Sequence, residues 1–139
     1  MNRFAWLNPL FLFVWIFRLI AIHSIGFGIA LITFPCEWLE FFGFTINQKF
    51  FAVQGGVFHI IISFVYIRAS NKPDDARDWV ALACITKFTA AIFLFSYYLF
   101  ATPVLMVLLS GFMDALMGFV MMGLYRNYLH YTNRKRSVP

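Results

Sequence analysis

Charged residues are scarce in this sequence of 139 residues: 12% are Asp, Glu, Lys or Arg, whereas 62% are hydrophobic. An average soluble domain has about 25% charged residues, so an ordinary soluble domain is excluded. Cysteine is scarce too, and neither Cys36 nor Cys84 belongs to a Cys-x-x-Cys pair, which disfavours dithiol redox chemistry. The sequence contains no P-loop, hydrolase triad pattern, zinc-ligand spacing or nucleic-acid-binding motif. We therefore expect a membrane protein without enzymatic activity.

Long apolar runs account for most of the sequence. A hydrocarbon core is about 30 Å thick and a helix rises about 1.5 Å per residue, so about 20 apolar residues span a bilayer. The pattern predicts an all-α membrane protein, a four-transmembrane-helix bundle with helices at about residues 9–34, 50–67, 80–101 and 104–124. Because these helices use nearly the whole chain, we expect a single transmembrane domain over residues 1–139.

The segment after the first apolar run, residues 35–42, predicts a short helix that lies in the membrane interface. Glu37 and Glu40 fall on one face of this helix, and aromatic and aliphatic residues occupy the rest. Gly43 follows it and can end the helix in a left-handed conformation.

Basic residues cluster at one end of the predicted helices, and they predict the orientation of the chain. With an even number of spans, one side receives Arg3, Arg68, Lys72, Arg77, Arg126, Arg134, Lys135 and Arg136. The positive-inside rule then places both termini in the cytoplasm. The formal net charge of +5 reflects this topology and contact with anionic lipid, so we expect no nucleic-acid partner. We expect the first segment to be retained rather than cleaved, because it is long and contains Arg18.

Four ionisable residues lie inside the apolar runs, one in each: Arg18, His59, Lys87 and Asp114. Counted from the basic ends, all four lie about 12–18 Å deep. A charge at mid-bilayer costs about 2.5–3.5 kcal/mol, so such residues usually face a bundle interior or cavity. Small residues share their helix faces, which also favours an inward position. The sequence predicts a buried polar layer in the bundle, with Gln54 as a further member.

Three interpretations of this layer remain open. In the structural one, Asp114 pairs with Arg18 or Lys87, while His59 and Gln54 bond across helices. In the second, two cations facing one carboxylate leave a surplus positive charge, which a quinone carbonyl, a lipid phosphate or a small carboxylate could offset. In the third, the layer forms part of a transporter or proton pathway, with the protein acting as an oligomer.

His23 lies about 140° around the first helix from Arg18, so we expect it to point away from the polar layer toward lipid, a protein partner or a pigment. Ligation of haem by two histidines would require His23 and His59 at similar depth. Counting residues places them about 21 Å and about 13 Å from the basic side. We therefore expect no haem, chlorophyll or metal ion.

The two halves of the chain follow one pattern: a basic residue in the first helix, a proline after it, and a small residue three positions before a polar one in the second helix. The corresponding residues are Arg18 and Lys87, Pro35 and Pro103, Gly56 and Gly111, and His59 and Asp114. This pattern predicts two consecutive helical hairpins related as a parallel repeat.

Several short motifs add to the repeat: Arg18, Phe34-Pro35, Trp38-Leu39…Gly43, Gln54-Gly55-Gly56, Lys87 and Gly111-x-x-Asp114-x-x-x-Gly118. Together they resemble the DoxX-like superfamily of small four-helix integral membrane proteins. The resemblance implies a membrane subunit associated with redox enzymes, including quinone-linked sulfur oxidation. A paired-cysteine motif of some relatives is missing here, which argues against a thiol-redox role.

The resemblance, the aromatic exterior and the small soluble portions favour an accessory or structural subunit of a larger redox or energy-transducing membrane complex. A protein that binds a quinone or lipid through Arg18, Gln54, His59, Lys87 and Asp114 is the alternative. The expected partners are the lipid bilayer and a larger membrane complex or further copies of this chain. The resemblance also implies the bacterial cytoplasmic membrane.

Overall fold

The computed structural model describes residues 8–43, 48–101 and 103–136, and these residues contain helices but no strand. The order along the chain is α1 (Pro9–Thr33), α2 (Cys36–Phe41), α3 (Phe50–Asn71), the 3-10 turn η2 (Pro73–Asp75), α4 (Arg77–Phe100) and α5 (Leu105–Arg136). Four of the helices are long and apolar enough to cross a membrane. The all-α fold, the four spanning helices and the short helix after the first span are confirmed, and the chain is a multi-pass membrane protein.

Two helices end later in the chain than the apolar runs predicted. The predicted ends were residues 67 and 124, but α3 continues to Asn71 and α5 continues to Arg136. The prediction ended each helix where an arginine follows the apolar run. Neither extension contains glycine or proline, so nothing in the local sequence ends the helix there. The part of α5 after Leu124 is therefore a basic helix that continues beyond the apolar span.

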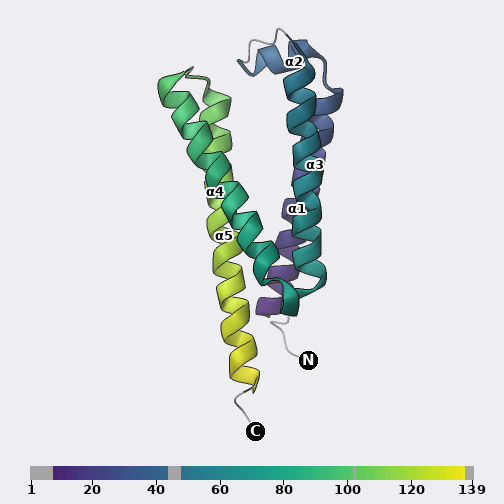
Figure 1. Cartoon of the computed structure of the whole chain (residues 1–139), viewed down its shortest axis with the longest axis vertical. Coiled ribbons are helices and arrows are strands. Elements are labelled where there is room, and N and C mark those ends of the chain that lie inside the picture. The colour runs from purple at the N-terminus through teal and green to yellow at the C-terminus, as the bar shows by residue number, and fades with distance from the viewer. Residues whose placement is uncertain (1–7, 44–47, 102, 137–139) are drawn as a thin grey trace.

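The spanning helices form two antiparallel hairpins, α1 with α3 and α4 with α5 (Figure 1). The hairpins meet near the chain termini and diverge toward α2 (Figure 1). We call the end where they meet the basic end, because it carries Arg68, Lys72, Arg77, Arg126, Arg134 and Lys135. The predicted division into two hairpins is thus confirmed.

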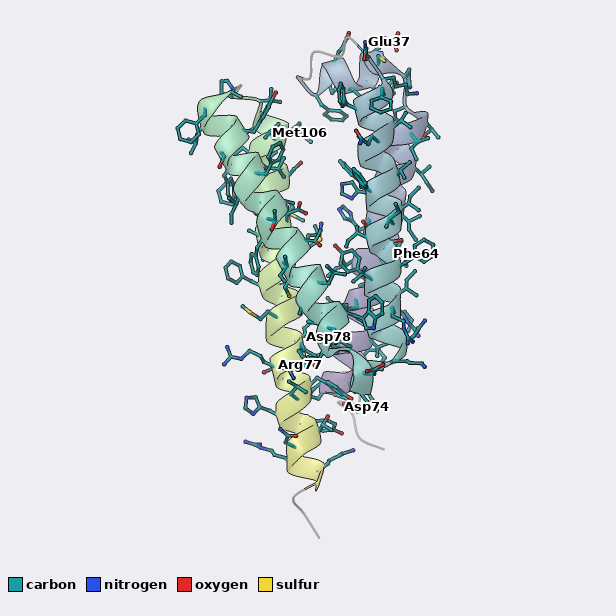
Figure 2. The ribbon with its side chains drawn as sticks, viewed as in Figure 1. Glu37, Phe64, Asp74, Arg77, Asp78 and Met106 are labelled. Atoms are coloured by element: carbon teal, nitrogen blue, oxygen red, sulfur yellow. The ribbon has the colours of Figure 1, made fainter. Side chains whose placement is uncertain are left out.

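Aromatic rings and one hydrogen bond join the two hairpins at the basic end. The Phe13 ring of α1 packs against Tyr125 and Tyr128 of α5, with centroid separations of 6.0 and 5.5 Å. The Tyr128 hydroxyl donates a hydrogen bond of 2.6 Å to Asp74 in η2. Figure 2 shows Asp74, Arg77 and Asp78 together at this end. The buried core lies in the same half of the bundle and includes Phe13, Phe17, Tyr66, Ala83, Met121 and Tyr128.

The first hairpin is held together by direct contact between its two backbones. A Cβ added at Gly28 would lie 2.7 Å from the Gly56 carbonyl oxygen, and one added at Gly56 would lie 2.6 Å from the Gly28 oxygen. Any side chain at either position would collide with backbone atoms. Small residues allow this close approach of helices in lipid, where packing rather than water exclusion drives association.

The second hairpin uses its glycines differently, as surfaces for aromatic rings. A Cβ at Gly111 would lie 2.8 Å from the Phe95 ring, and one at Gly118 would lie 2.9 Å from the Phe88 ring. The two hairpins therefore share a topology but not a packing mode.

At the other end of the molecule, Gly43 ends α2 with a φ of +91°, as its position predicted.

Candidate functional site

Lys87 and Asp114 form an ion pair between α4 and α5 in the apolar part of the second hairpin. The Lys87 ammonium lies 2.5 Å from one Asp114 carboxylate oxygen, and the two side chains are only 6% and 14% exposed. Lys87 lies on the buried stripe of α4 between Ala83 and Ala91, whose small side chains leave room for its long stem. The sequence left Arg18 and Lys87 as two possible partners for Asp114, and in the structure the partner is Lys87.

Ser24 and His59 join α1 to α3 in the first hairpin. The Ser24 hydroxyl, which is buried, donates a 2.9 Å hydrogen bond to the His59 carbonyl oxygen and lies 3.3 Å from His59 Nδ1. A hydroxyl has one proton, and the carbonyl can only accept. The Ser24 hydroxyl thus contacts both the backbone and the imidazole of His59, and the tautomer of the ring decides which atom donates in the second contact. The expected cross-helix bond of His59 is confirmed, with Ser24 as its partner.

The two pairs lie within electrostatic range of each other. The charges of Lys87 and Asp114 act on the His59 imidazole. Tyr66 of α3 is fully buried about two turns from His59 toward the basic end, within electrostatic range of Asp114. Its hydroxyl has no hydrogen-bond partner among the described residues. We call Ser24, His59, Lys87 and Asp114 the central polar cluster.

Arg18 does not belong to this cluster, and the prediction that it faces the bundle is wrong. Its side chain is exposed and reaches back toward the basic end, where its guanidinium lies 3.5 Å from the Asn71 side-chain oxygen. The guanidinium also lies 5.8 Å from the Trp15 ring centroid. An arginine inside a span avoids the cost of burial in this way, by extending its long stem toward the interface.

The position of Arg18 also removes the predicted surplus of positive charge. Lys87 and Asp114 carry one charge each and neutralise one another, so a bound anion is not needed to balance the cluster. Gln54 is exposed on α3 and, among the described contacts, forms no hydrogen bond to another helix. The predicted layer of five residues therefore becomes three of those residues together with Ser24.

His23 is exposed on α1, but it does not point away from the polar residues as predicted, because it lies within electrostatic range of His59. The depth difference from His59 was wrong, since Ser24, the next residue, contacts His59 directly. The error arose because α3 extends beyond Arg68, so the basic ends of the two apolar runs are not level. The Phe27 ring packs against both imidazoles, with centroid separations of 6.3 Å to His23 and 4.9 Å to His59.

The cysteines and possible metal ligands are separate features. Cys36 and Cys84 are both free thiols, and the Cys84 sulfur lies 3.8 Å from the Gly118 carbonyl oxygen. In the part of the chain that the structure describes, no three residues of the His, Cys, Asp or Glu type are arranged to hold a metal ion.

Sequence reasoning missed Ser24 and Tyr66, although helical periodicity contained a signal for Ser24. Phe17, Ala21, Ser24 and Gly28 recur at helical spacing and form the buried stripe of α1. At about 100° per residue, Arg18 lies about 120° around the helix from Ser24, on the flank of that stripe. Tyr66 gave no comparable signal, because a tyrosine near the end of an apolar run is equally typical of the membrane interface.

Comparisons with known protein families, with curated proteins and with solved structures find no match. The DoxX-like resemblance therefore stays a prediction from the motifs. The function has to be inferred from the geometry of the chain itself.

Proposed function

We propose that this protein is a non-catalytic accessory subunit of a larger membrane complex of the redox or energy-transducing class. The observation that carries the proposal is the exposed imidazole of His23 within the α1 span. At about 1.5 Å per residue, it lies about 21 Å from the start of α1 at Pro9, too far for a short side chain to reach the interface. An ionisable group at that depth needs a partner, and a helix of another subunit supplies one.

The central polar cluster is compatible with a structural role. Its charges are balanced by the Lys87–Asp114 pair, and the Ser24 hydroxyl bonds to His59. Buried polar pairs of this kind fix which helices pack together and in which register. A subunit whose polar groups serve its own assembly has no need of a substrate.

The exterior also suits a protein packed within a complex. Only 22–28% of the most apolar window of each spanning helix is buried within the chain itself. Large rings lie on the surface of every hairpin, among them Phe58, Phe64, Phe93 and Phe100. Lipid covers some of this surface in any membrane protein, but aromatic side chains also give large contact areas at helix interfaces.

We propose the bacterial cytoplasmic membrane as the location, with both termini in the cytoplasm. The orientation follows from the basic residues, since those at the ends of α3, α4 and α5 gather at the basic end. Reporter fusions at residues 101 and 139 test it: the C-terminal fusion should report the cytoplasm and the fusion after α4 the opposite side.

Mild-detergent extraction followed by a native gel and mass spectrometry of the band tests the accessory role. The wild-type chain should migrate with a large assembly, and His23→Leu should release it as a small species. Thr89→Val is the matched control, because it also removes a polar group from an exposed position within a span, on α4 rather than α1. Migration of the wild type alone, near its mass of 16.2 kDa or a small multiple, would contradict the proposal.

The buried Tyr66 hydroxyl favours a second candidate function, the binding of a small molecule with a hydrogen-bonding head, such as a quinone. The Tyr66 hydroxyl is a buried polar group without a partner among the described residues, and the His59 imidazole lies about two turns away on the same helix. Lipid extraction and mass spectrometry of purified protein would identify such a ligand. Ligand content unchanged by Tyr66→Phe would contradict this second function.

A further inference from the structure

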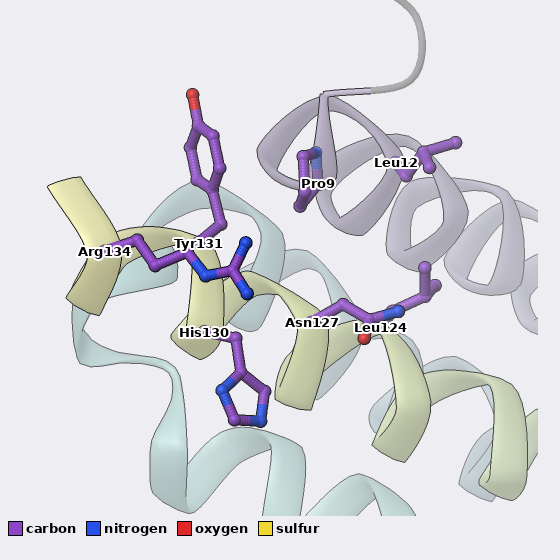
Figure 3. Close-up of a pocket in the computed structure, with 7 residues that line it drawn as sticks. All are labelled: Pro9, Leu12, Leu124, Asn127, His130, Tyr131 and Arg134. Atoms are coloured by element: carbon purple, nitrogen blue, oxygen red, sulfur yellow. The ribbon is translucent and has the colours of Figure 1, made fainter.

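A groove lies at the basic end, between the beginning of α1 and the extension of α5, outside the central polar cluster. Its volume is about 380 Å³. Pro9 and Leu12 line it from α1, and Leu124, Asn127, His130, Tyr131 and Arg134 line it from α5 (Figure 3). The groove exists because α5 continues past Leu124, which places polar side chains beside the start of the first span.

The lining changes from apolar to polar along the axis of α5. Leu124 lies at the end of the apolar run, and Pro9 and Leu12 lie in the first turns of the first span. Asn127, His130 and Arg134 follow at successive turns of α5, with Arg134 about 15 Å beyond Leu124. The Arg134 side chain extends back along α5 toward Asn127 and His130 (Figure 3). The apolar end thus faces the membrane interior and the polar end faces the aqueous side.

The charged side chains on the extension of α5 all have the same sign, and the carboxylates of this end lie on η2 and the start of α4. No aspartate or glutamate follows Asp114 in the sequence, whereas Arg126, Arg134 and Lys135 lie on the extension of α5. Arg134 lines the groove, and Lys135 packs over the Tyr131 ring with its ammonium 4.8 Å from the centroid. Basic helices beside a membrane span attract anionic headgroups, and a guanidinium can bind a phosphate through two parallel hydrogen bonds.

We propose that this groove binds one anionic phospholipid. The phosphate accepts hydrogen bonds from Arg134 and His130, Asn127 contacts the glycerol region, and an acyl chain lies beside Leu12 and Leu124. A soluble phosphate would use the polar end only and would leave the apolar end empty. A lipid matches both ends of the groove. Its acyl chain would point toward the membrane interior and its headgroup toward the aqueous side, as the spanning helices require. The proposal does not depend on whether the protein is an accessory subunit.

Native mass spectrometry of the purified full-length chain tests the proposal. The protein is equilibrated with detergent micelles that contain phosphatidylglycerol and phosphatidylcholine in equal amounts. Wild-type protein should retain one phosphatidylglycerol in preference to phosphatidylcholine. Arg134→Gln should weaken retention about tenfold, the usual effect of losing a charge-assisted hydrogen bond. Arg134→Lys should recover part of the retention.

Arg126→Gln is the matched control, because it removes the same charge from the same helix at an exposed position outside the groove. Its retention of phosphatidylglycerol should stay within about twofold of wild type. Equal loss in Arg126→Gln and Arg134→Gln would overturn the proposal, since it would mean nonspecific attraction to the basic helix. Equal retention of the two lipids by wild type would overturn it as well.

The apolar end has its own test, which separates a lipid from a free anion. Leu12→Gln places a polar group at the membrane-facing end of the groove and should reduce phosphatidylglycerol retention without changing the charge. Inorganic phosphate at millimolar concentration should not displace the lipid. Displacement by phosphate, or unchanged retention in Leu12→Gln, would assign the groove to a small anion instead. Circular dichroism of each variant should confirm that helical content is unchanged.

Discussion

The Lys87 ammonium lies 2.5 Å from the Asp114 carboxylate, so a nearly buried ion pair joins α4 to α5 inside the membrane-spanning part of the chain. Taking both charges out of water is costly, and their attraction offsets that cost only while both partners remain. The pair is therefore a stronger determinant of which helices associate than of how stable the hairpin is. This distinction makes the effect of removing one partner different from the effect of removing both.

Asp114→Asn should lower the free energy of unfolding by about 3–5 kcal/mol, because it leaves the Lys87 ammonium buried without a counter-charge. Lys87→Met should have a similar effect through the unpaired carboxylate. The double variant should be more stable than Asp114→Asn alone, because no buried charge remains. Reversible unfolding in mixed micelles with increasing sodium dodecyl sulfate measures all three. Simple addition of the two single effects in the double variant would show that the residues do not act as a pair.

Ser24→Ala should destabilise the first hairpin by about 0.6–1.7 kcal/mol, the range of hydrogen bonds between helices in a membrane. The variant removes both contacts between the Ser24 hydroxyl and His59. Ser63→Ala is the matched control: both serines are 1% exposed, but the Ser63 hydroxyl donates to the Ile60 carbonyl within its own helix. The same unfolding titration should show the larger loss for Ser24→Ala. Equal losses would mean that the bond to His59 does not stabilise the contact between α1 and α3.

Tyr66→Phe should leave the free energy of unfolding unchanged or raise it by about 1–3 kcal/mol. The Tyr66 hydroxyl is buried without a hydrogen bond among the described residues, so its removal abolishes a desolvation cost and no contact. Tyr128→Phe provides the contrast, because it removes the 2.6 Å hydrogen bond to Asp74 and should destabilise the junction of the hairpins. Thermal unfolding in a mild detergent compares the two. A clear loss of stability in Tyr66→Phe would instead indicate that a ligand or water occupies the space beside the hydroxyl.

The sequence was sufficient to predict the fold, because the lengths of apolar runs dictate spanning helices almost independently of tertiary contacts. The helix ends were harder. Hydrophobicity reports where the bilayer ends rather than where the helix ends, and the helical segment from Leu124 to Arg136 has no apolar signal. The groove between α1 and α5 was unpredictable for the same reason, since it depends on that segment.

The central polar cluster could be predicted in part. Lys87, Asp114 and His59 stood out because ionisable groups are rare in apolar runs, and their helix faces were informative. Depth was misjudged because counting from the ends of apolar runs assumes that those ends are level. The contact between Ser24 and His59 shows that they are not. Arg18 was misplaced because a long side chain can reach the interface from within a span, so the position of its Cα does not determine the position of its charge.

Gly28→Ala should destabilise the first hairpin, whereas Gly26→Ala should not. An added Cβ at Gly28 would lie 2.7 Å from the Gly56 carbonyl oxygen, and no rotamer change can move a backbone atom away. The helices must separate, at a cost of about 1–3 kcal/mol that is typical of overpacking. At Gly26 nothing lies within 4 Å of the added Cβ, so the higher helix propensity of alanine should stabilise the chain by about 0.5–1 kcal/mol. The two substitutions are chemically identical and lie in the same helix, so unfolding titrations of both isolate the effect of the backbone contact. Similar values for the two variants would mean that α1 and α3 do not approach as closely as Gly28 and Gly56 require, and the register that brings Ser24 to His59 would then have to be reconsidered.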